Sequence, residues 1–412
     1  MENIPDFQVQ MFITLSFPES NISLVVLNFT VQSDNIPLHY IYPLCKTSFP
    51  KGERFPKMSL LYREAPRTRR PIVMIGAGGI VRDAHLPAYR KAGFDVAAIF
   101  DKDATRAKNT AEEFGIPYVP ASLEEAVSTA SPNAVFDIAT PASAFLEILE
   151  YLPDGRGVLL QKPLGEDLAE ARKICDLCRR KKLAAAANFQ LRYAPAICAA
   201  RRMIVEGKIG KLHDMEIRVT VFTPWHLWTF LESKSRVEIL YHSVHYIDLL
   251  RSFLGDPKSV YAKTMKHPQM EKLASTRSNI ILNFGDTVRA NIATNHGHGF
   301  GLRHQESYVK WEGTEGAIKT RMGLLMDYPK GVPDEFEYCI LEAEHPPEWT
   351  SLPIEGTWYP DAFIGPMSDL MCFLDGVIDS LPTSVDDACR TMAVVEAAYE
   401  SSASEGTMAP YD

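Results

Sequence analysis

The most constraining feature of this 412-residue chain is an apolar run that ends in closely spaced glycines. Ile72–Ile75 contains only large apolar residues, and such a strand needs apolar cover on both faces, as in the centre of a parallel sheet. Gly76 allows a tight turn, and Gly78 has no side chain that would hold a ligand away from the backbone. We expect a helix to begin near Gly79, where its free N–H groups favour an anion. Val81 departs from this pattern, because Gly or Ala usually occupies that position.

A second apolar strand about twenty residues further on supports a nucleotide site. Val96–Phe100 is followed by Asp101, whose carboxylate is placed to bind ribose hydroxyls. The glycines alone would also fit an ordinary strand-to-helix turn, but with this strand and carboxylate they predict a site for NAD or NADP. Asp101 favours NAD because it repels a 2′-phosphate, whereas Lys102 and Arg106 could offset that repulsion and leave NADP as the alternative. The predicted cofactor contacts are Gly76, Gly78, Gly79, Ile80, Val81, Asp101, Lys102, Arg106, Thr140, Pro141, Gln161 and Lys162.

Composition limits the class of protein. The chain is 46% hydrophobic and 23% charged, which is typical of a soluble globular protein, and its length allows two or three domains. Its 43 Lys and Arg against 52 Asp and Glu give a net charge of −9, and no basic stripe indicates a nucleic acid partner. Seven cysteines, an odd number, favour a reducing compartment and a cytoplasmic location. We interpret Cys175 and Cys178 as core thiols, since they share a helical face with apolar residues.

Residues 1–69 differ from the rest and are expected to form a poorly ordered N-terminal extension. Polar residues and Pro18 interrupt the apolar clusters before they reach membrane-spanning length, so no membrane partner is expected. Glu2 and Asp6 stand where a signal peptide would be basic. A chain that begins at Met58 is predicted to match the full chain in stability and cofactor affinity.

The order of predicted elements indicates an α/β fold with two domains. Residues 70–193 are predicted to form a Rossmann dinucleotide-binding domain with a doubly wound parallel sheet. Residues 194–412 are predicted to form a substrate-binding and oligomerisation α+β domain with an open, mainly antiparallel sheet. The expected strands are 72–75, 96–100, 134–139, 157–160, 183–188, 215–222, 259–266, 279–284, 288–294 and 307–311. The expected helices are 79–92, 104–114, 144–152, 167–182, 196–206, 237–254, 367–380 and 385–402.

Two residues are candidates for proton transfer. Lys162 directly follows a buried strand whose carboxyl end should face the ligand, and enclosure beside a cationic nicotinamide would lower its pKa. A solvated loop lysine is the alternative interpretation. His245 lies on the polar face of a predicted helix with Tyr241 and Asp248, where it could act as a general base. A hydrogen-bonded structural histidine is the alternative for this residue.

Several short motifs, in a consistent order over roughly residues 70–406, resemble the glucose–fructose oxidoreductase / inositol dehydrogenase / MocA (Gfo/Idh/MocA) family. They are Gly-Ala-Gly-Gly-Ile at 76–80, Asp-Ala-His-Leu-Pro-Ala at 83–88, Ile-Ala-Thr-Pro at 138–141, Gln-Lys-Pro at 161–163, Gly-Lys-Ile-Gly at 207–210, His-x-x-Asp-Leu at 245–249 and the stretch 373–406. The resemblance implies that Lys162 and His245 act around the nicotinamide on a substrate hydroxyl or carbonyl. It also implies an open sheet with one face toward the cofactor domain and the other toward another subunit.

Two positions depart from the family pattern. Gln161 stands where the family usually has Glu, and Tyr241 stands where inositol-type dehydrogenases often have Asp. The second change removes the residue that would orient His245, so Tyr241 or His242 is left as the candidate replacement.

The wall of the predicted cleft supplies candidate substrate contacts. Arg192 could bind a carboxylate or several hydroxyls, and Trp225 could cover the apolar face of a sugar ring. The predicted substrate residues are Arg192, Trp225, Tyr241, His242 and Asp248. The histidines at 296, 298 and 304 lack a spaced acidic partner, so no metal is expected.

These features together predict an NAD(P)-dependent oxidoreductase. It would transfer hydride between the nicotinamide and a hydroxyl or keto carbon of a sugar, cyclitol or sugar-acid derivative. The partner would be this small polyhydroxylated substrate, and a homo-oligomer, dimer or tetramer, is expected. Two alternatives stay open: a cofactor-binding regulator without turnover, and a redox-neutral enzyme that recycles its bound NAD.

Overall fold

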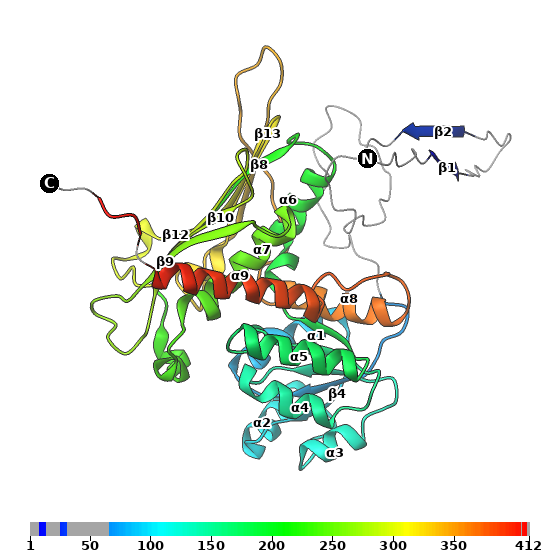
Figure 1. The fold of residues 1–412 in the computed structure, drawn as a ribbon. Helices are drawn as coiled ribbons and strands as arrows, with labels where there is room; N and C mark the ends of the chain where they lie inside the picture. Colours follow the sequence, from blue (N-terminus) through cyan, green and yellow to red (C-terminus); the bar gives the residue numbers. More distant parts are fainter. Residues whose placement is uncertain (1–7, 14–24, 31–65, 405, 410–412) are drawn as a thin grey trace, which may run out of the picture. The chain divides into compact units, whose positions relative to one another are not determined.

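The computed structural model describes residues 8–13, 25–30, 66–404 and 406–409 (Figure 1). The chain divides into two compact units, Met1–Phe55 and Pro56–Asp412. In the first unit, strands β1 (Gln8–Ile13) and β2 (Val25–Thr30) form an antiparallel pair. The other expectations for residues 1–69 concern segments outside the described residues. In the described part of the chain, no helix is both long enough and apolar enough to cross a membrane.

The first sheet of the second unit is parallel, as predicted. Its five strands lie in the order β4-β3-β5-β6-β7. Their bounds are β3 (Ile72–Ile75), β4 (Val96–Phe100), β5 (Val135–Ile138), β6 (Gly157–Leu160) and β7 (Ala184–Ala187). β3 is buried along its whole length, which agrees with its uninterrupted apolar sequence. This is the Rossmann arrangement, and every strand expected in this part of the chain is present.

Helices connect these strands, and polar side chains fix where several of them begin. The helices are α1 (Leu86–Ala92), α2 (Ala104–Phe114), α3 (Leu123–Ser128), α4 (Phe145–Tyr151) and α5 (Leu168–Arg180). Asp103, Ser122 and Asp167 each accept a hydrogen bond from a backbone N–H in the first turn of α2, α3 and α5, respectively. α3 was not expected, because its single amphipathic turn is too short to give a periodic signal.

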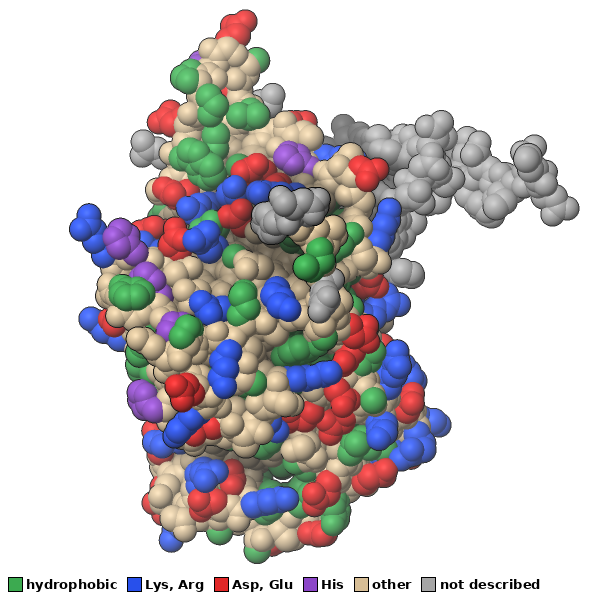
Figure 2. Space-filling model, turned by 60° about the vertical axis from the view of Figure 1, so that its left-hand side comes forward, with side chains coloured by type: hydrophobic (Ala, Val, Ile, Leu, Met, Phe, Trp, Pro, Cys, Tyr) green, Lys and Arg blue, Asp and Glu red, His purple; other side chains and the backbone are tan. Residues whose placement is uncertain are grey.

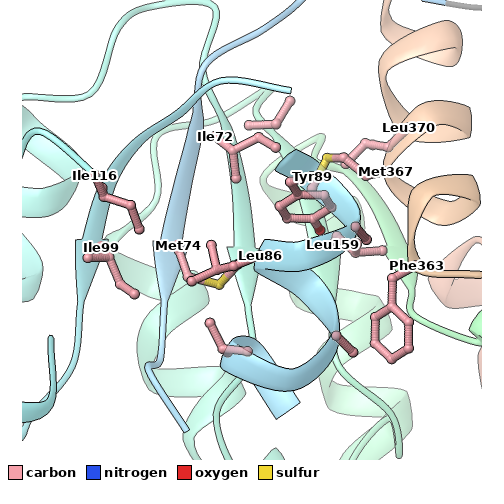
Figure 3. Close-up of a cluster of buried hydrophobic side chains, with 14 of the residues drawn as sticks. Ile72, Met74, Leu86, Tyr89, Ile99, Ile116, Leu159, Phe363, Met367 and Leu370 are labelled. Carbon is pink, nitrogen blue, oxygen red and sulfur yellow. The ribbon is translucent and has the colours of Figure 1, made fainter. Parts of the chain in front are cut away.

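A helix from the C-terminal part of the chain completes the core of the parallel sheet. α8 (Ile364–Leu374) contributes Met367 and Leu370, and Phe363 lies just before it. In Figure 3 Met367 and Leu370 point toward Tyr89 of α1, and the Phe363 ring belongs to the same cluster and packs against His85. α8 ends six residues earlier than the predicted helix 367–380, because Gly376 takes a positive φ of 63° and turns the chain.

The second sheet has eight strands in the order β15-β14-β13-β12-β8-β11-β10-β9. Only β8 and β11 pair in parallel, so the sheet is mainly antiparallel, as predicted. The bounds are β8 (Leu212–Thr220), β9 (Ser259–Met265), β10 (Arg277–Asn283), β11 (Arg289–Asn295), β12 (Glu306–Gly313), β13 (Gly316–Arg321), β14 (Glu335–Ile340) and β15 (Thr350–Ser351). β13, β14 and β15 were not expected.

Three further helices belong to the part of the chain that follows the parallel sheet. They are α6 (Pro195–Val205), α7 (Val244–Leu254) and α9 (Val385–Ala403). α9 packs against α5, α7 and β9, and in Figure 1 it runs between the parallel sheet and the larger sheet. The predicted helix 237–254 contains a π-helical turn, Ile239–Ser243, ahead of α7. The face shown in Figure 2 carries acidic and basic side chains interspersed with one another.

Candidate active site

The glycine-rich turn after β3 has the shape that a diphosphate requires. Gly76 has φ of 110°, and a Cβ atom there would lie 2.5 Å from the carbonyl oxygen of Ala139, so only glycine fits. A Cβ on Gly78 would meet no atom within 4 Å, which leaves the backbone accessible beside the turn. Helical geometry begins at Gly79, as expected, and Val81 is fully buried in the core. The turn therefore fits a dinucleotide, with backbone N–H groups at the N-terminus of a helix.

Asp101 is fixed at the end of β4. Its Oδ2 accepts a hydrogen bond from the backbone N–H of Ala77 at 2.7 Å, and its Oδ1 accepts one from Asp103 at 2.9 Å. The Arg106 guanidinium lies 3.6 Å from Oδ1, while the Lys102 side chain is 80% exposed and points to solvent. Asp101 thus joins the glycine-rich turn to the neighbouring strand, and its carboxylate stays at the edge where a ribose would bind.

Gln161 takes part in a buried hydrogen-bond network beneath the turn. Its Nε2 lies 3.0 Å from Nε2 of His85, whose Nδ1 lies 2.7 Å from Asp137 Oδ2. Tyr89 also donates to Asp137. Because an amide nitrogen only donates, His85 Nε2 must accept and Nδ1 must carry the proton. A glutamate at position 161 could not make this contact unless one partner were protonated, which explains the departure from the family pattern.

The same glutamine fixes the backbone of Lys162. Gln161 Oε1 accepts a hydrogen bond from the Lys162 N–H at 2.8 Å. The Lys162 Nζ donates to the carbonyl oxygen of Tyr241 at 2.7 Å, across to the helix that precedes α7. Tyr241 lies in the π-helical turn, a feature that is frequent at functional sites. Burial lowers the pKa of Lys162 from its ordinary value of 10.5 to about 8, which brings the amine into the range of acid–base chemistry.

Two histidines lie close to this lysine. Burial lowers the pKa of His245 well below 6.5, and the nearby charge of Lys162 lowers it further. Burial also lowers the pKa of His242, with contributions from His296, Lys162 and His245. The Nδ1 atoms of His242 and His245 are buried and have no hydrogen-bond partner among the described residues. Both rings are therefore neutral and able to bind a polar ligand.

The Tyr241 side chain does not replace the missing aspartate. Its hydroxyl donates to Glu166, at 2.9 Å from Oε2, and Lys234 pairs with the same carboxylate at 2.7 Å. Only the backbone carbonyl of Tyr241 faces Lys162. The contacts of this phenol therefore give no support to the expectation that it binds the substrate. His242, in contrast, is close enough to Lys162 and His245 for both to affect its pKa.

Arg192 and Asp248 lie in a buried ion cluster. Arg192 Nε donates to Asp248 Oδ2 at 2.6 Å and its Nη2 to Oδ1 at 2.5 Å. The same guanidinium pairs with Asp387 at 2.6 Å and donates to the Pro382 carbonyl oxygen. Thr391 donates to Asp248 as well. Both side chains are buried, and their hydrogen bonds within the protein give no support to the predicted substrate contacts.

The ring of Trp225 packs against two histidines. Its ring centroid is 5.1 Å from that of His242 and 5.8 Å from that of His296. Sequence analysis missed His296 and the buried Glu238 as neighbours of this site, and the His-Gly-His pattern at 296–298 was the available signal. In the part of the chain that the structure describes, no three His, Cys, Asp or Glu side chains form a group that could hold a metal ion.

Comparison with known proteins places this site in a family. The model of the oxidoreductase family with an NAD-binding Rossmann fold, Gfo/Idh/MocA, matches residues 70–189. The model of the Gfo/Idh/MocA C-terminal domain matches residues 197–319. The chain belongs to the Gfo/Idh/MocA family. The resemblance noted from the motifs is confirmed, as is the expectation of an NAD-binding Rossmann domain.

Similar members of this family are sugar dehydrogenases and reductases. A D-apiose dehydrogenase of Paraburkholderia graminis is 25% identical over 79% of this chain and 86% of the relative. A 1,5-anhydro-D-fructose reductase of Ensifer adhaerens is 31% identical, but the match spans only 44% of this chain and 56% of that enzyme.

Solved structures agree with the fold. An oxidoreductase from Agrobacterium radiobacter, in complex with NAD+, L-tartaric acid and magnesium, has a TM-score of 0.67 at 21% identity. The match covers 82% of this chain and 97% of that protein. Levoglucosan dehydrogenase in complex with NADH and levoglucosan has a TM-score of 0.66 at 20% identity, over 81% and 97% of the two chains. At these identities the likeness shows the fold alone.

Proposed function

We propose that this protein is an NAD-dependent oxidoreductase acting on an alcohol or keto carbon of a polyhydroxylated small molecule. The observation that carries the proposal is the Lys162 amine, held between the Rossmann domain and the Tyr241 carbonyl beside two neutral histidines. Membership of the Gfo/Idh/MocA family supports it. A regulator that only binds the cofactor would not require an amine with a pKa of about 8 at this position.

The proposed cofactor contacts follow the geometry of the Rossmann turn. The backbone at Gly76, Gly78 and Gly79 would hold the diphosphate, and Asp101 would bind the ribose. Thr140 and Pro141, after β5, would flank the nicotinamide end together with Gln161. The nicotinamide, when bound, accepts or donates the hydride. We propose NAD rather than NADP, since Asp101 is held in place and the Lys102 side chain points to solvent.

Lys162 is the proposed proton-transfer group. In the oxidation direction its neutral Nζ accepts the proton of the reacting hydroxyl, and in reduction its ammonium returns that proton to the carbonyl oxygen. His245 is neutral and binds the same oxygen or its neighbour through a ring nitrogen, which orients the substrate. Water is excluded because His245 is buried between the rings of Phe189 and Trp358.

The substrate is proposed to be a neutral sugar or cyclitol rather than a sugar acid. Arg192, the side chain expected to pair with a carboxylate, is occupied by Asp248 and Asp387. Trp225 and the neutral ring of His242 instead offer an aromatic face and a hydrogen-bonding nitrogen, which suit a ring that carries hydroxyls.

The test is a substrate screen with NAD+ and with NADP+ against neutral sugars, cyclitols and matched sugar acids. We expect reduction of NAD+ by a neutral substrate, and a loss of at least about 100-fold in turnover for Lys162→Ala with unchanged cofactor affinity. No turnover with tight cofactor binding would favour the regulator instead. Tightly bound cofactor with substrate conversion but no net change in absorbance would favour the redox-neutral enzyme.

We further propose a cytoplasmic homo-oligomer. The odd number of cysteines supports the location, and the exposed face of the larger sheet supports the assembly. Tyr261 and Ile281, directly opposite each other on β9 and β10, are 61% and 51% exposed. Light scattering of the purified protein should give a multiple of the 46.1 kDa chain mass.

A further inference from the structure

A buried carboxylate lies next to the candidate active site and has no part in the proposed reaction. Glu238 is fully buried and precedes the π-helical turn that leads to His242 and His245. Ser243 Oγ donates to its Oε1 at 2.7 Å, and Ser278 Oγ donates to its Oε2. A helix N-terminus also stabilises a negative charge. The surroundings of Glu238 are therefore those of an ionised side chain.

His296 faces this carboxylate from the end of β11. Its Nε2 lies 3.5 Å from Glu238 Oε1, close enough for an ion pair but longer than a hydrogen bond, and its Nδ1 lies 2.9 Å from Thr223 Oγ1. Burial raises the pKa of Glu238, but the adjacent His296 and the two serine hydroxyls outweigh burial, so that the pKa is lowered. A buried carboxylate that stays ionised needs a positive partner, and His296 is placed to supply one.

The other side of His296 packs against His242. Their ring centroids are 4.5 Å apart with planes tilted by 40°, and Trp225 packs against both rings. After burial, His296 is the largest influence that lowers the pKa of His242, followed by Lys162 and then His245. The Nδ1 of His242 is buried without a hydrogen-bond partner among the described residues.

We propose that Glu238 and His296 are positioning residues that hold His242 neutral, with a ring nitrogen available to a substrate hydroxyl beside Lys162. Glu238 faces the Nε2 of His296, and the electrostatic influence of His296 disfavours a proton on the adjacent His242 ring. Inositol-type dehydrogenases often have a carboxylate at the position of Tyr241. In this chain Glu238 supplies a carboxylate about one turn earlier, and it acts through His296. The contact between His242 and a substrate hydroxyl rests on the proposed function. The neutral state of His242 does not depend on it.

The protonation of His242 can be measured directly by NMR on protein labelled with ¹³C-histidine. His242→Asn identifies the resonance by its disappearance. In the wild type we expect the protonation midpoint of His242 to lie well below the ordinary value of 6.5, whereas His296→Asn should raise this midpoint by at least about one pH unit. Glu238→Gln should act in the same direction, because His296 then loses the carboxylate that its Nε2 faces. His304→Asn, at an exposed histidine, is the matched control and should change nothing.

The same variants test the consequence for turnover. We expect His242→Asn to lower kcat/KM by about tenfold without changing cofactor affinity, and His296→Asn to move the acid limb of the pH profile to higher pH. Identical His242 titration curves in the wild type, His296→Asn and Glu238→Gln would overturn the positioning role. If no substrate is turned over, the proposed function fails, but the titration still decides this inference. Thermal melting of each variant checks that it is folded.

Discussion

Two buried polar clusters meet the helix that carries His245, and they differ in how completely their hydrogen bonds are made. The cluster of Arg192, Asp248 and Asp387 is closed, since the guanidinium donates to both carboxylates and to a backbone carbonyl. In the other cluster, His242 and His245 each keep a buried ring nitrogen without a partner in the described residues. A satisfied network stabilises the fold, whereas unsatisfied buried groups are unfavourable unless a ligand completes them. We therefore propose a structural role for the first cluster and a chemical role for the second.

The largest expected effect is on stability, from opening the closed cluster. Arg192→Met leaves Asp248 and Asp387 buried without their cation and should lower the free energy of unfolding by about 3–5 kcal/mol. Turnover per folded molecule should stay within about threefold. Denaturant unfolding measures the first quantity and activity at low temperature the second.

The matched control for this variant is a surface pair. Arg180→Met breaks an ion pair with Glu150 in which the side chains are 64% and 59% exposed, and should cost about 1 kcal/mol or less. If Arg192→Met costs no more than this control, or if it abolishes turnover while folded, Arg192 belongs to the site after all.

The second prediction concerns the open cluster. His245→Asn removes a ring that would bind the reacting oxygen, and turnover should fall about 100-fold while the melting temperature stays within a few degrees. Steady-state kinetics at saturating NAD+ would measure this, with the exposed His226→Asn as control. A large loss of stability with little loss of turnover would reverse the assignment of the two clusters.

A smaller effect is expected on the cofactor side. Asp101→Asn keeps the size of the side chain but removes its charge, so the preference for NAD over NADP should fall by about tenfold. Fluorescence titration with the two cofactors gives both dissociation constants. Equal or tighter NADP binding by the wild type would contradict the proposed preference.

A further prediction concerns the pH dependence of stability. The pKa of Lys162 is about 8 in the folded protein against an ordinary 10.5, so between these values the unfolded chain holds a proton that the native state lacks. Unfolding free energy should therefore rise with pH through this window, and the difference between the wild type and Lys162→Met should show the rise. A pH-independent difference would mean that the amine is solvated.

The cofactor half of the site could be predicted from sequence because its signals are local. The strand Ile72–Ile75, the glycine turn and Asp101 lie within about thirty residues, and each depends on backbone geometry or a single side chain. The closed cluster could not be predicted in this way. Arg192 was predicted to bind substrate from its expected position in the cleft wall. Its partner Asp387 lies 195 residues later, on α9, so no local pattern connects the two residues.

Other misses also have a physical origin. A π-helical turn has no distinct hydrophobic period, so the expected helix 237–254 gave no sign that the carbonyl of Tyr241 would face Lys162. The sequence offered His296 only as a possible metal ligand, yet its ring is buried against His242 and Glu238. In both cases tertiary contacts, not local sequence, decide the role of the side chain.

The most direct test of the account is the pH dependence of hydride transfer in a single turnover, measured by stopped flow on the enzyme–NAD+ complex. We predict that oxidation of the substrate accelerates with pH through an inflection at or below about pH 8, because burial lowers the pKa of Lys162 to about 8 and the cationic nicotinamide would lower it further. Lys162→Met should be slower by at least about 100-fold and should lack this inflection. A variant that keeps the wild-type rate and the wild-type inflection would contradict the assignment of Lys162 as the proton-transfer group.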